Sequence, residues 1–216
     1  YDIEASKYDK EPNYSLLRVL ASETRMPICY GGGIKNLDIA KKIFELGIEK
    51  ISLNKTIFNN INLLKSLIKQ IGSQSIAVTL DVAKNKNDQK YYIYTNYGND
   101  LFKANFLEFI KKLEDIGIGE IIINNIDLDG TMKGYDISLI RSVYNNITIP
   151  SSFIGGASSY KEINEIANEL NVVGLGAGSL FFFKGKNKAV LFNYINDFIN
   201  GSGGGIWTPD ITNMSR

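Results

Sequence analysis

Apolar residues along the chain form two kinds of run: short runs of strand length and longer runs with helical spacing. The short runs predict strands over 1–4, 27–31, 50–54, 75–82, 120–126, 149–154 and 172–177. Helical runs follow them over 14–23, 37–46, 60–71, 105–116, 137–144, 160–170 and 188–199. Strict alternation of strand and helix indicates a parallel sheet.

The predicted strands are β-branched and apolar on both faces, as in a sheet covered on both sides. Seven strand–helix units, with one more expected upstream of residue 1, make up the eight of a (β/α)8 TIM barrel that lacks its first strand and helix. We expect one barrel domain over 1–199, with strands 2 to 8, and a flexible tail over 200–216. The polar segment 84–98 predicts a β-hairpin excursion from this barrel.

Three signals at predicted strand ends occur twice at nearly one offset. The first copies are 2–6 (DIEAS), the glycines 31–33 and Asn54, and the second copies are 127–131 (DLDGT), Gly155 with Gly156, and Ser179. The offsets are 127 − 2 = 125, 155 − 31 = 124 and 179 − 54 = 125. Asp81 also ends a strand, but its counterpart would fall at 81 − 125 = −44. A duplicated half-barrel explains this pattern, whereas a doubly wound open sheet, the competing architecture, does not predict it.

Composition narrows the classes of function. Lysine and arginine (24) nearly balance aspartate and glutamate (23), so there is no electrostatic case for nucleic acid. The apolar runs are too short for a membrane span, and no signal peptide is visible. The single Cys29 excludes an internal disulfide. These observations fit a cytoplasmic protein. Histidine is absent, so acid–base chemistry falls to carboxylates, Lys, Tyr or Cys29. We predict no metal site and no cofactor.

Glycine pairs after two of the strands predict phosphate sites. Gly32 and Gly33 follow one strand, and Gly155 and Gly156 follow another in the second half. Glycine lets the backbone approach an anion closely, and the N–H groups of such loops favour phosphate. One pair alone fits a tight turn equally well. Two pairs at one offset favour two facing phosphate sites, and hence a ligand with a phosphate at each end.

Carboxylates and amides at the strand ends are candidates for chemistry. Asp81 and Asp127 follow apolar strands, where a carboxylate is costly unless it is paired or hydrated. Asp127 and Asp129 also fit a role in binding loop N–H groups, whereas Asp81 is central, so we favour Asp81 as general acid or base. Asn54, Asn124 and Thr131 are candidate donors to substrate, although for Asn124 a bond to neighbouring backbone explains the residue nearly as well.

Six longer segments resemble one known family. They are DIEAS (2–6), PICYGGGI (27–34), KISLN (50–54), GSQSIAVTLDV (72–82), GEIIINNIDLDGTMKGYD (119–136) and GAGSLFFFKGK (176–186). Together they resemble the cyclase subunit of imidazole glycerol phosphate synthase, the HisF family. The resemblance implies a barrel of the ribulose-phosphate-binding type and a role in histidine biosynthesis.

The resemblance also implies a reaction and a partner. A glutaminase subunit would dock at the N-terminal mouth of the barrel, and ammonia would pass through the barrel. At the other face the ammonia would react with a bis-phosphorylated ribulosyl-formimino-aminoimidazole carboxamide nucleotide. The products would be imidazole glycerol phosphate and aminoimidazole carboxamide ribotide.

Individual residues take roles from this resemblance. Asp81 resembles one of two catalytic aspartates, the other belonging to the first strand. Residues that resemble phosphate contacts or lie near them are Gly32, Gly33 and Asn54 at one end, and Asn124, Asp129, Gly130, Gly155, Gly156, Gly178 and Ser179 at the other. Lys50 and Glu120 begin their strands, where a surface ion pair is the default, but they resemble two of four charged residues around the ammonia entrance. Gln74 resembles a residue of the glutaminase interface.

Departures from the family pattern leave two functions open. Ile154 stands where Ser or Cys is usual, which weakens the second phosphate site, and Lys55 stands where Thr or Ser is usual and binds phosphate only as a point charge. The ending 179–194 resembles a paralogous branch associated with acetamidino modification of surface sugars. The alternatives are therefore a cyclase, and an ammonia-channelling subunit without cyclase activity. Because unpaired sheet edges open the core to water, we also expect the truncated chain to be impaired as an enzyme.

Overall fold

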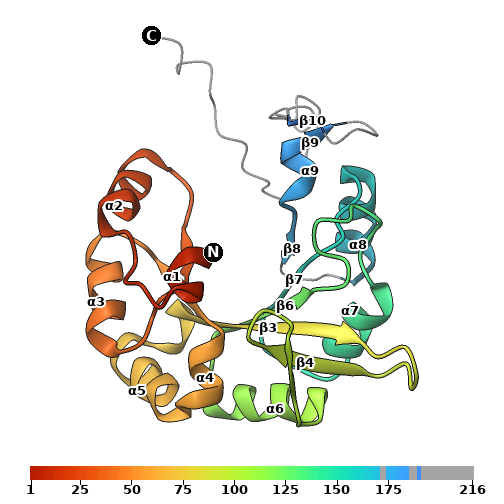
Figure 1. The fold of residues 1–216 in the computed structure, drawn as a ribbon, viewed down its shortest axis with the longest axis horizontal. Coiled ribbons are helices and arrows are strands. Elements are labelled where there is room, and N and C mark those ends of the chain that lie inside the picture. Colours follow the sequence, from red (N-terminus) through yellow and green to blue (C-terminus); the bar gives the residue numbers. More distant parts are fainter. Residues whose placement is uncertain (171–173, 185–188, 191–216) are drawn as a thin grey trace.

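The protein folds as a curved sheet with helices along its outer side (Figure 1). The computed structural model describes residues 1–170, 174–184 and 189–190. The strands are β1 (Cys29–Gly31), β2 (Lys50–Leu53), β3 (Ile76–Lys84), β4 (Tyr91–Thr95), β5 (Asp100–Phe102), β6 (Glu120–Asn125), β7 (Ser151–Ile154), β8 (Gly174–Gly176), β9 (Phe183–Lys184) and β10 (Ala189–Val190). The helices are α1 (Ile3–Lys7), α2 (Tyr14–Glu23), α3 (Leu37–Glu45), α4 (Lys55–Asn59), α5 (Ile61–Ile71), the 3-10 turn η1 (Ser73–Ser75), α6 (Phe106–Ile116), α7 (Ile137–Tyr144), α8 (Tyr160–Leu170) and α9 (Ser179–Phe182).

Six strands form the parallel sheet in the order β1-β2-β3-β6-β7-β8. Each strand lies beside the next parallel strand of the chain, with at least one helix between them. A doubly wound sheet would reverse its strand order part of the way across, and the described sheet does not. The predicted (β/α)-barrel architecture is therefore confirmed.

The helices begin where the sequence predicts because polar side chains cap them. The capping residues, each accepting a hydrogen bond from the backbone N–H three positions later, are Asn13, Asn36, Asn60, Asn105 and Asp136. Helices α2, α7 and α8 have the predicted bounds, and α3, α5 and α6 differ from them by one residue at one end. None of the described helices is long and apolar enough to span a bilayer.

Two predicted elements near the ends of the chain are wrong where the structure describes them. The segment 1–4 is not a strand: Asp2 caps α1, its Oδ1 accepting a hydrogen bond from Ala5 N at 2.9 Å. Only one ladder-like bond remains there, from Asp2 N to the Gly31 oxygen at 2.7 Å. Of the predicted helix 188–199, the described residues Ala189–Val190 form β10, antiparallel to β9. The rest of that helix and the predicted tail lie outside the described residues.

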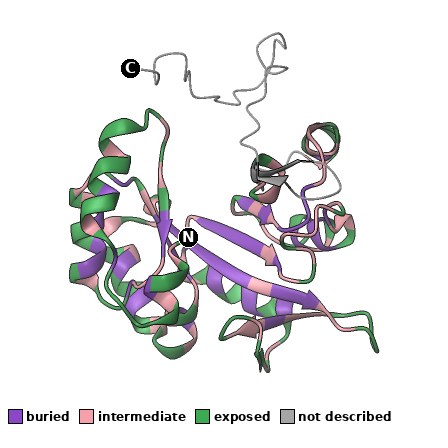
Figure 2. Ribbon diagram, turned by 45° about the horizontal axis from the view of Figure 1, so that its top comes forward, coloured by how far each residue is buried: buried purple, intermediate pink, exposed green. Residues whose placement is uncertain are grey.

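The hydrophobic core lies between the sheet and the outer helices, as the buried strands in Figure 2 indicate. Strand residues on the outer face are apolar and almost fully buried: Ile51, Leu53, Val78, Leu80, Val82, Ile121, Ile123 and Phe153. Because side chains alternate along a strand, the inner face carries the residues between them. Those include the polar residues Ser52, Thr79, Asp81, Glu120, Asn124 and Ser152, beside apolar ones such as Ala77, Ile122 and Ile154. The prediction of two apolar faces is therefore wrong for the inner face.

The predicted hairpin is present and gains a third strand. Strand β4 pairs antiparallel with β3, and β5 pairs antiparallel with β4. The ring of Phe102 on β5 packs against Phe58 and Phe109, with centroid distances of 4.7 and 5.1 Å. This aromatic cluster fixes the excursion against α4 and α6, so that the turn between β4 and β5 is held near the ends of the parallel strands.

Candidate active site

A cavity of about 900 Å³ opens at the carboxyl ends of the parallel strands. In (β/α) barrels this is the face that carries the active site. The predicted site residues that line it are Gly32, Gly33, Asn54, Asp81, Asn124, Asp129, Gly155 and Gly178. Of the predicted phosphate-site residues, Gly130, Gly156 and Ser179 do not line it.

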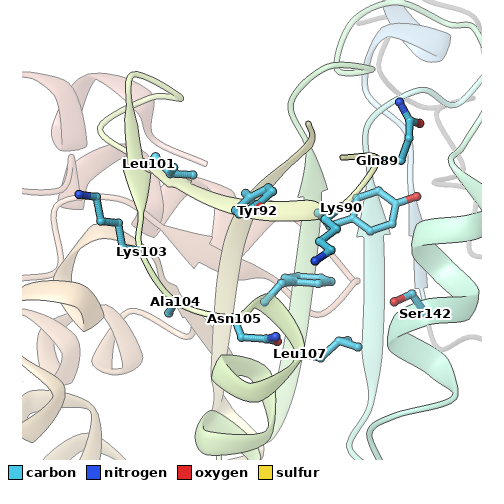
Figure 3. Close-up of a pocket in the computed structure, with 11 residues that line it drawn as sticks. Gln89, Lys90, Tyr92, Leu101, Lys103, Ala104, Asn105, Leu107 and Ser142 are labelled. Carbon is cyan, nitrogen blue, oxygen red and sulfur yellow. The ribbon is translucent and has the colours of Figure 1, made fainter. Parts of the chain in front are cut away.

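A second cavity, of about 620 Å³, lies on the outer side of the excursion. Figure 3 shows its lining side chains, which come from residues 89–92 at the start of β4, from β5 and the segment that leads into α6, and from Ser142 of α7. None of the predicted site residues lines it, and it does not lie at the parallel strand ends. The strand-end cavity is therefore the candidate active site.

Asp81 lies between two amide side chains. Asn54 Nδ2 donates to Asp81 Oδ2 at 3.1 Å, and Asn124 Nδ2 donates to Oδ1 at 2.7 Å. The sheet register explains this, because Asp81 on β3 pairs with Asn124 on β6, while Asn54 directly follows β2. The carboxylate is thus held in one orientation at the cavity wall. The buried Asn124 Oδ1 has no hydrogen-bond partner among the described residues.

A column of polar side chains continues below Asp81 along the inner face. Thr79 Oγ1 shares hydrogen bonds with Ser52 Oγ at 2.6 Å and with the Tyr1 hydroxyl at 2.8 Å. Two residues before Ser52 on β2, Lys50 Nζ contacts Glu120 Oε2 at 2.5 Å. The inner face therefore presents hydrogen-bonding groups from the N-terminal mouth up to the cavity.

Glu120 is the centre of the cluster at the N-terminal mouth. Its other oxygen, Oε1, accepts a hydrogen bond from Ser152 Oγ at 2.5 Å. The Glu120 side chain is only 11% exposed and Lys50 is 33% exposed, so this is a largely buried ion pair rather than the surface pair considered from the sequence. Gln74 is exposed on η1, at the same end of the sheet. Cys29 on β1 is exposed and lies beside Lys50 of β2 in the sheet register. Desolvation of the Cys29 thiol and the negative charge of Glu120 raise the pKa of this thiol to about 11.

The two predicted glycine pairs both have positive φ angles. Gly32 and Gly33 have φ of 137° and 64°, and Gly155 and Gly156 have φ of 97° and 100°. A Cβ on Gly32 would lie 2.4 Å from the Asp2 oxygen, and one on Gly155 would lie 2.5 Å from a backbone oxygen of β6. Only glycine fits at such places. The structural repeat thus pairs Gly32 with Gly155, an offset of 155 − 32 = 123. This offset is one residue smaller than the 124 obtained from the sequence by pairing Gly31 with Gly155.

The polar side chains of the acidic loop after β6 have different positions and partners. Asp127 Oδ2 accepts a hydrogen bond from Lys84 N at 3.3 Å, so this carboxylate binds loop backbone, as one of the two interpretations predicted. Thr131 Oγ1 donates to the Leu128 oxygen at 2.7 Å and is therefore already engaged locally. Asp129 lines the cavity. Gly130 lies near Ser179, whose Oγ would be 3.8 Å from an added Cβ.

Several lining residues were not predicted from the sequence. They include Tyr1, Asp9, Lys35, Asn96 and Tyr97. Lys35 follows the glycines 31–33 by two positions, a spacing that would have revealed it. Asn96 and Tyr97 sit in the turn between β4 and β5, and nothing in the local sequence indicates that this turn reaches the cavity.

The fold and the strand-end cavity define a (β/α)-barrel protein with its site at the carboxyl ends of the strands. The sequence profile of the family described as "Histidine biosynthesis protein" matches residues 1–187. The chain therefore belongs to this family.

Three relatives illustrate the similarity. The "Putative imidazole glycerol phosphate synthase subunit hisF3" of Vibrio vulnificus is 43% identical over 193 residues, 89% of this chain and 74% of the relative. A Leptospira borgpetersenii protein called "Putative imidazole glycerol phosphate synthase subunit HisF" is 43% identical over 195 residues, 90% of this chain and 77% of the relative. The "Imidazole glycerol phosphate synthase subunit HisF" of Clostridium botulinum is 32% identical over 196 residues, 91% and 78% of the two chains.

Proposed function

We propose that this protein is the cyclase subunit of an imidazole glycerol phosphate synthase. It takes ammonia and a bis-phosphorylated formimino-aminoimidazole carboxamide nucleotide, and it releases imidazole glycerol phosphate and aminoimidazole carboxamide ribotide. The observation that carries the proposal is the position of Asp81, held by Asn54 and Asn124 in a cavity that is lined by Gly32 and Gly33 from one glycine pair and by Gly155 from the other. The names of the relatives point the same way.

Asp81 is the proposed general acid–base group. A carboxylate can accept a proton from the attacking nitrogen and return it to the nitrogen that leaves, which a chain without histidine must do with another side chain. The two amide donors hold the carboxylate oxygens in fixed directions, so the proton is exchanged at a defined point. The unpartnered Asn124 Oδ1 is placed to accept a hydrogen bond from a substrate N–H.

The two glycine pairs are the proposed ends of the substrate site. Gly32 and Gly33, with Asn54, would bind one phosphate, and Gly155, with Gly178, would bind the other. A ligand bound at both ends is stretched across the cavity, which places its middle part opposite Asp81. The aliphatic Ile154 also lines the cavity beside Gly155, so the second phosphate would depend more on backbone groups.

The opposite mouth is the proposed docking site for a glutaminase subunit. Lys50 and Glu120 close the base of the inner face, and exposed Gln74 lies at the same end. Ser52 and Thr79 connect that base with Asp81 and offer hydrogen bonds to a neutral ammonia molecule on its way. Ammonia made by the partner would thus pass along the inner face of the sheet to the cavity.

Turnover of the bis-phosphorylated nucleotide with ammonium salt tests the proposal. The wild-type protein, as the full-length gene product, should form imidazole glycerol phosphate, detected by mass spectrometry, and its Asp81→Asn variant should not. Asp115→Asn, an exposed change on α6, is the control for loss of one negative charge. Absence of the imidazole product from wild type, in the presence of a glutaminase subunit and with ammonium, would overturn the proposal.

A second candidate function is an ammonia-channelling subunit for acetamidino modification of sugars. Ile154 favours it, because a β-branched side chain stands in the cavity at the strand end where a hydroxyl or thiol would bind phosphate. In that function the Lys50–Glu120 mouth and the polar column are retained while cyclisation is lost. Glutaminase stimulation by the bound barrel, without any imidazole product, would favour this candidate over the first.

A further inference from the structure

One side of the cavity carries an acidic side chain among cationic ones. Asp9, Lys35 and Lys55 all line the cavity next to the pair Gly32 and Gly33. Lys35 Nζ contacts Asp9 Oδ1 at 2.8 Å and also donates to the Asp9 backbone oxygen at 2.6 Å. A Cβ on Gly33 would lie 2.7 Å from the Lys10 oxygen, so the loop that carries Asp9 is packed directly on the glycine pair.

Lys55 is the second cation of this group. It directly follows Asn54 and has no ion-pair or hydrogen-bond partner in the part of the chain that the structure describes. The hydrogen bond and charge of Lys35, and to a smaller extent the charge of Lys55, lower the pKa of the Asp9 carboxyl. Two cations thus face one carboxylate, which leaves one positive charge uncompensated.

We propose that Lys35 and Lys55 bind the substrate phosphate at the Gly32–Gly33 end, and that the Asp9 carboxylate competes with that phosphate for them. The inference rests on the phosphate-binding part of the proposed function and adds the charged residues that set its affinity. A phosphate carries more charge than a carboxylate and has more acceptor oxygens, so it satisfies two ammonium groups better than Asp9 does. Because Lys35 is also held by the Asp9 backbone oxygen, its amine stays in place when the carboxylate leaves.

This arrangement predicts changes of opposite sign for two substitutions at one site. Asp9→Asn removes the competing anion but leaves the backbone oxygen that positions Lys35, so phosphate should bind more tightly, by about two- to fivefold. Lys55→Gln removes a cation, so phosphate should bind more weakly, by about tenfold. Lys55→Arg keeps the charge and should stay close to wild type.

Isothermal titration of the protein with inorganic phosphate tests the inference. Matched controls on α6 are Asp115→Asn and Lys112→Gln, which make the same charge changes at exposed positions away from the cavity. The controls should leave the Kd unchanged, and thermal melting shows whether each variant is folded. Added potassium chloride should reduce the difference between Asp9→Asn and wild type, because the competition is between exposed charges.

The inference is overturned if Asp9→Asn binds phosphate no better than wild type, if Lys55→Gln binds equally well, or if no folded variant binds millimolar phosphate. The binding measurement involves no turnover, so its outcome is separate from that of the cyclase assay. Opposite shifts in Kd without imidazole product would refute only the proposed reaction. Product formation with an unchanged Kd in both variants would refute only the roles of Asp9 and Lys55.

Discussion

Replacing Asp81 by asparagine is the sharpest perturbation of the site. In the wild type both carboxylate oxygens accept, one from Asn54 Nδ2 at 3.1 Å and one from Asn124 Nδ2 at 2.7 Å. An asparagine at position 81 keeps one acceptor but turns the other oxygen into an NH₂ donor. One of the two neighbouring amides must then rotate to avoid two donors facing each other.

The structure indicates which amide rotates and what the rotation costs. Asn124 Oδ1 is buried without a partner among the described residues, so turning Asn124 over breaks no other hydrogen bond. The rotation exchanges an unmet acceptor for an unmet donor, so the cost comes mainly from the two hydrogen bonds at position 81, which no longer involve a charged group and weaken by about 1 kcal/mol each. We therefore expect Asp81→Asn to lower the free energy of unfolding by about 1–3 kcal/mol and to stay folded.

The effect on catalysis should be far larger than the effect on stability. Loss of a positioned acid–base group lowers kcat by about 10² to 10⁴-fold. Ammonium-dependent product formation measures kcat, and urea unfolding measures stability, with Asp115→Asn as the control. If Asp81→Asn kept a tenth or more of the wild-type kcat, the reasoning that makes Asp81 the proton-transferring group would be refuted.

Three further predictions concern the glycine pairs and the N-terminal mouth. Gly155→Ala should lower the free energy of unfolding, measured in urea, by more than Gly72→Ala does. Both glycines have φ near 100°, so a backbone strain of about 1–2 kcal/mol is common to the two variants. Of the two, only Gly155 has backbone within 4 Å of an added Cβ, so any excess measures the clash. Glu120→Gln leaves the Lys50 ammonium without its carboxylate, so it should lower glutamine-dependent turnover. Ammonium-dependent turnover should stay within about twofold of the wild-type value. Equal losses in the two assays would contradict the assignment of Lys50 and Glu120 to the ammonia entrance. Cys29 should be alkylated at pH 8 about 100-fold more slowly than a thiol of pKa 9.0, because a pKa raised to about 11 lowers the thiolate fraction by that factor. An alkylation rate that stops rising below pH 9 would contradict the raised pKa of Cys29.

Local chemistry explains which elements could be predicted. Asn36, Asn60 and Asn105 are caps whose position in the sequence fixes where a helix begins, and the helices after them were predicted to within one residue. The segment 1–4 failed because its apolar–polar alternation is too short to separate a strand from a helix start, and Asp2 turned out to be a cap.

The site was predictable as far as it lies on strand ends. Asp81 and Asn124 are paired in register on neighbouring parallel strands and Asn54 directly follows the strand on the other side of β3, so their positions in the sequence already imply proximity. Asp9 and Tyr97 reach the cavity through turns whose path depends on packing elsewhere, Tyr97 through the aromatic contacts of the excursion. No local pattern encodes such a path.

The polar inner face has a consequence for how this protein can change over time. Stability depends mainly on the apolar layer between strands and helices, where Ile51, Val78 and Ile121 are fully buried. The chemistry depends on the alternate positions of the same strands. Substitutions on the inner face can therefore alter the reaction while the scaffold persists, which is the condition under which a gene copy can acquire a new activity without first losing its fold.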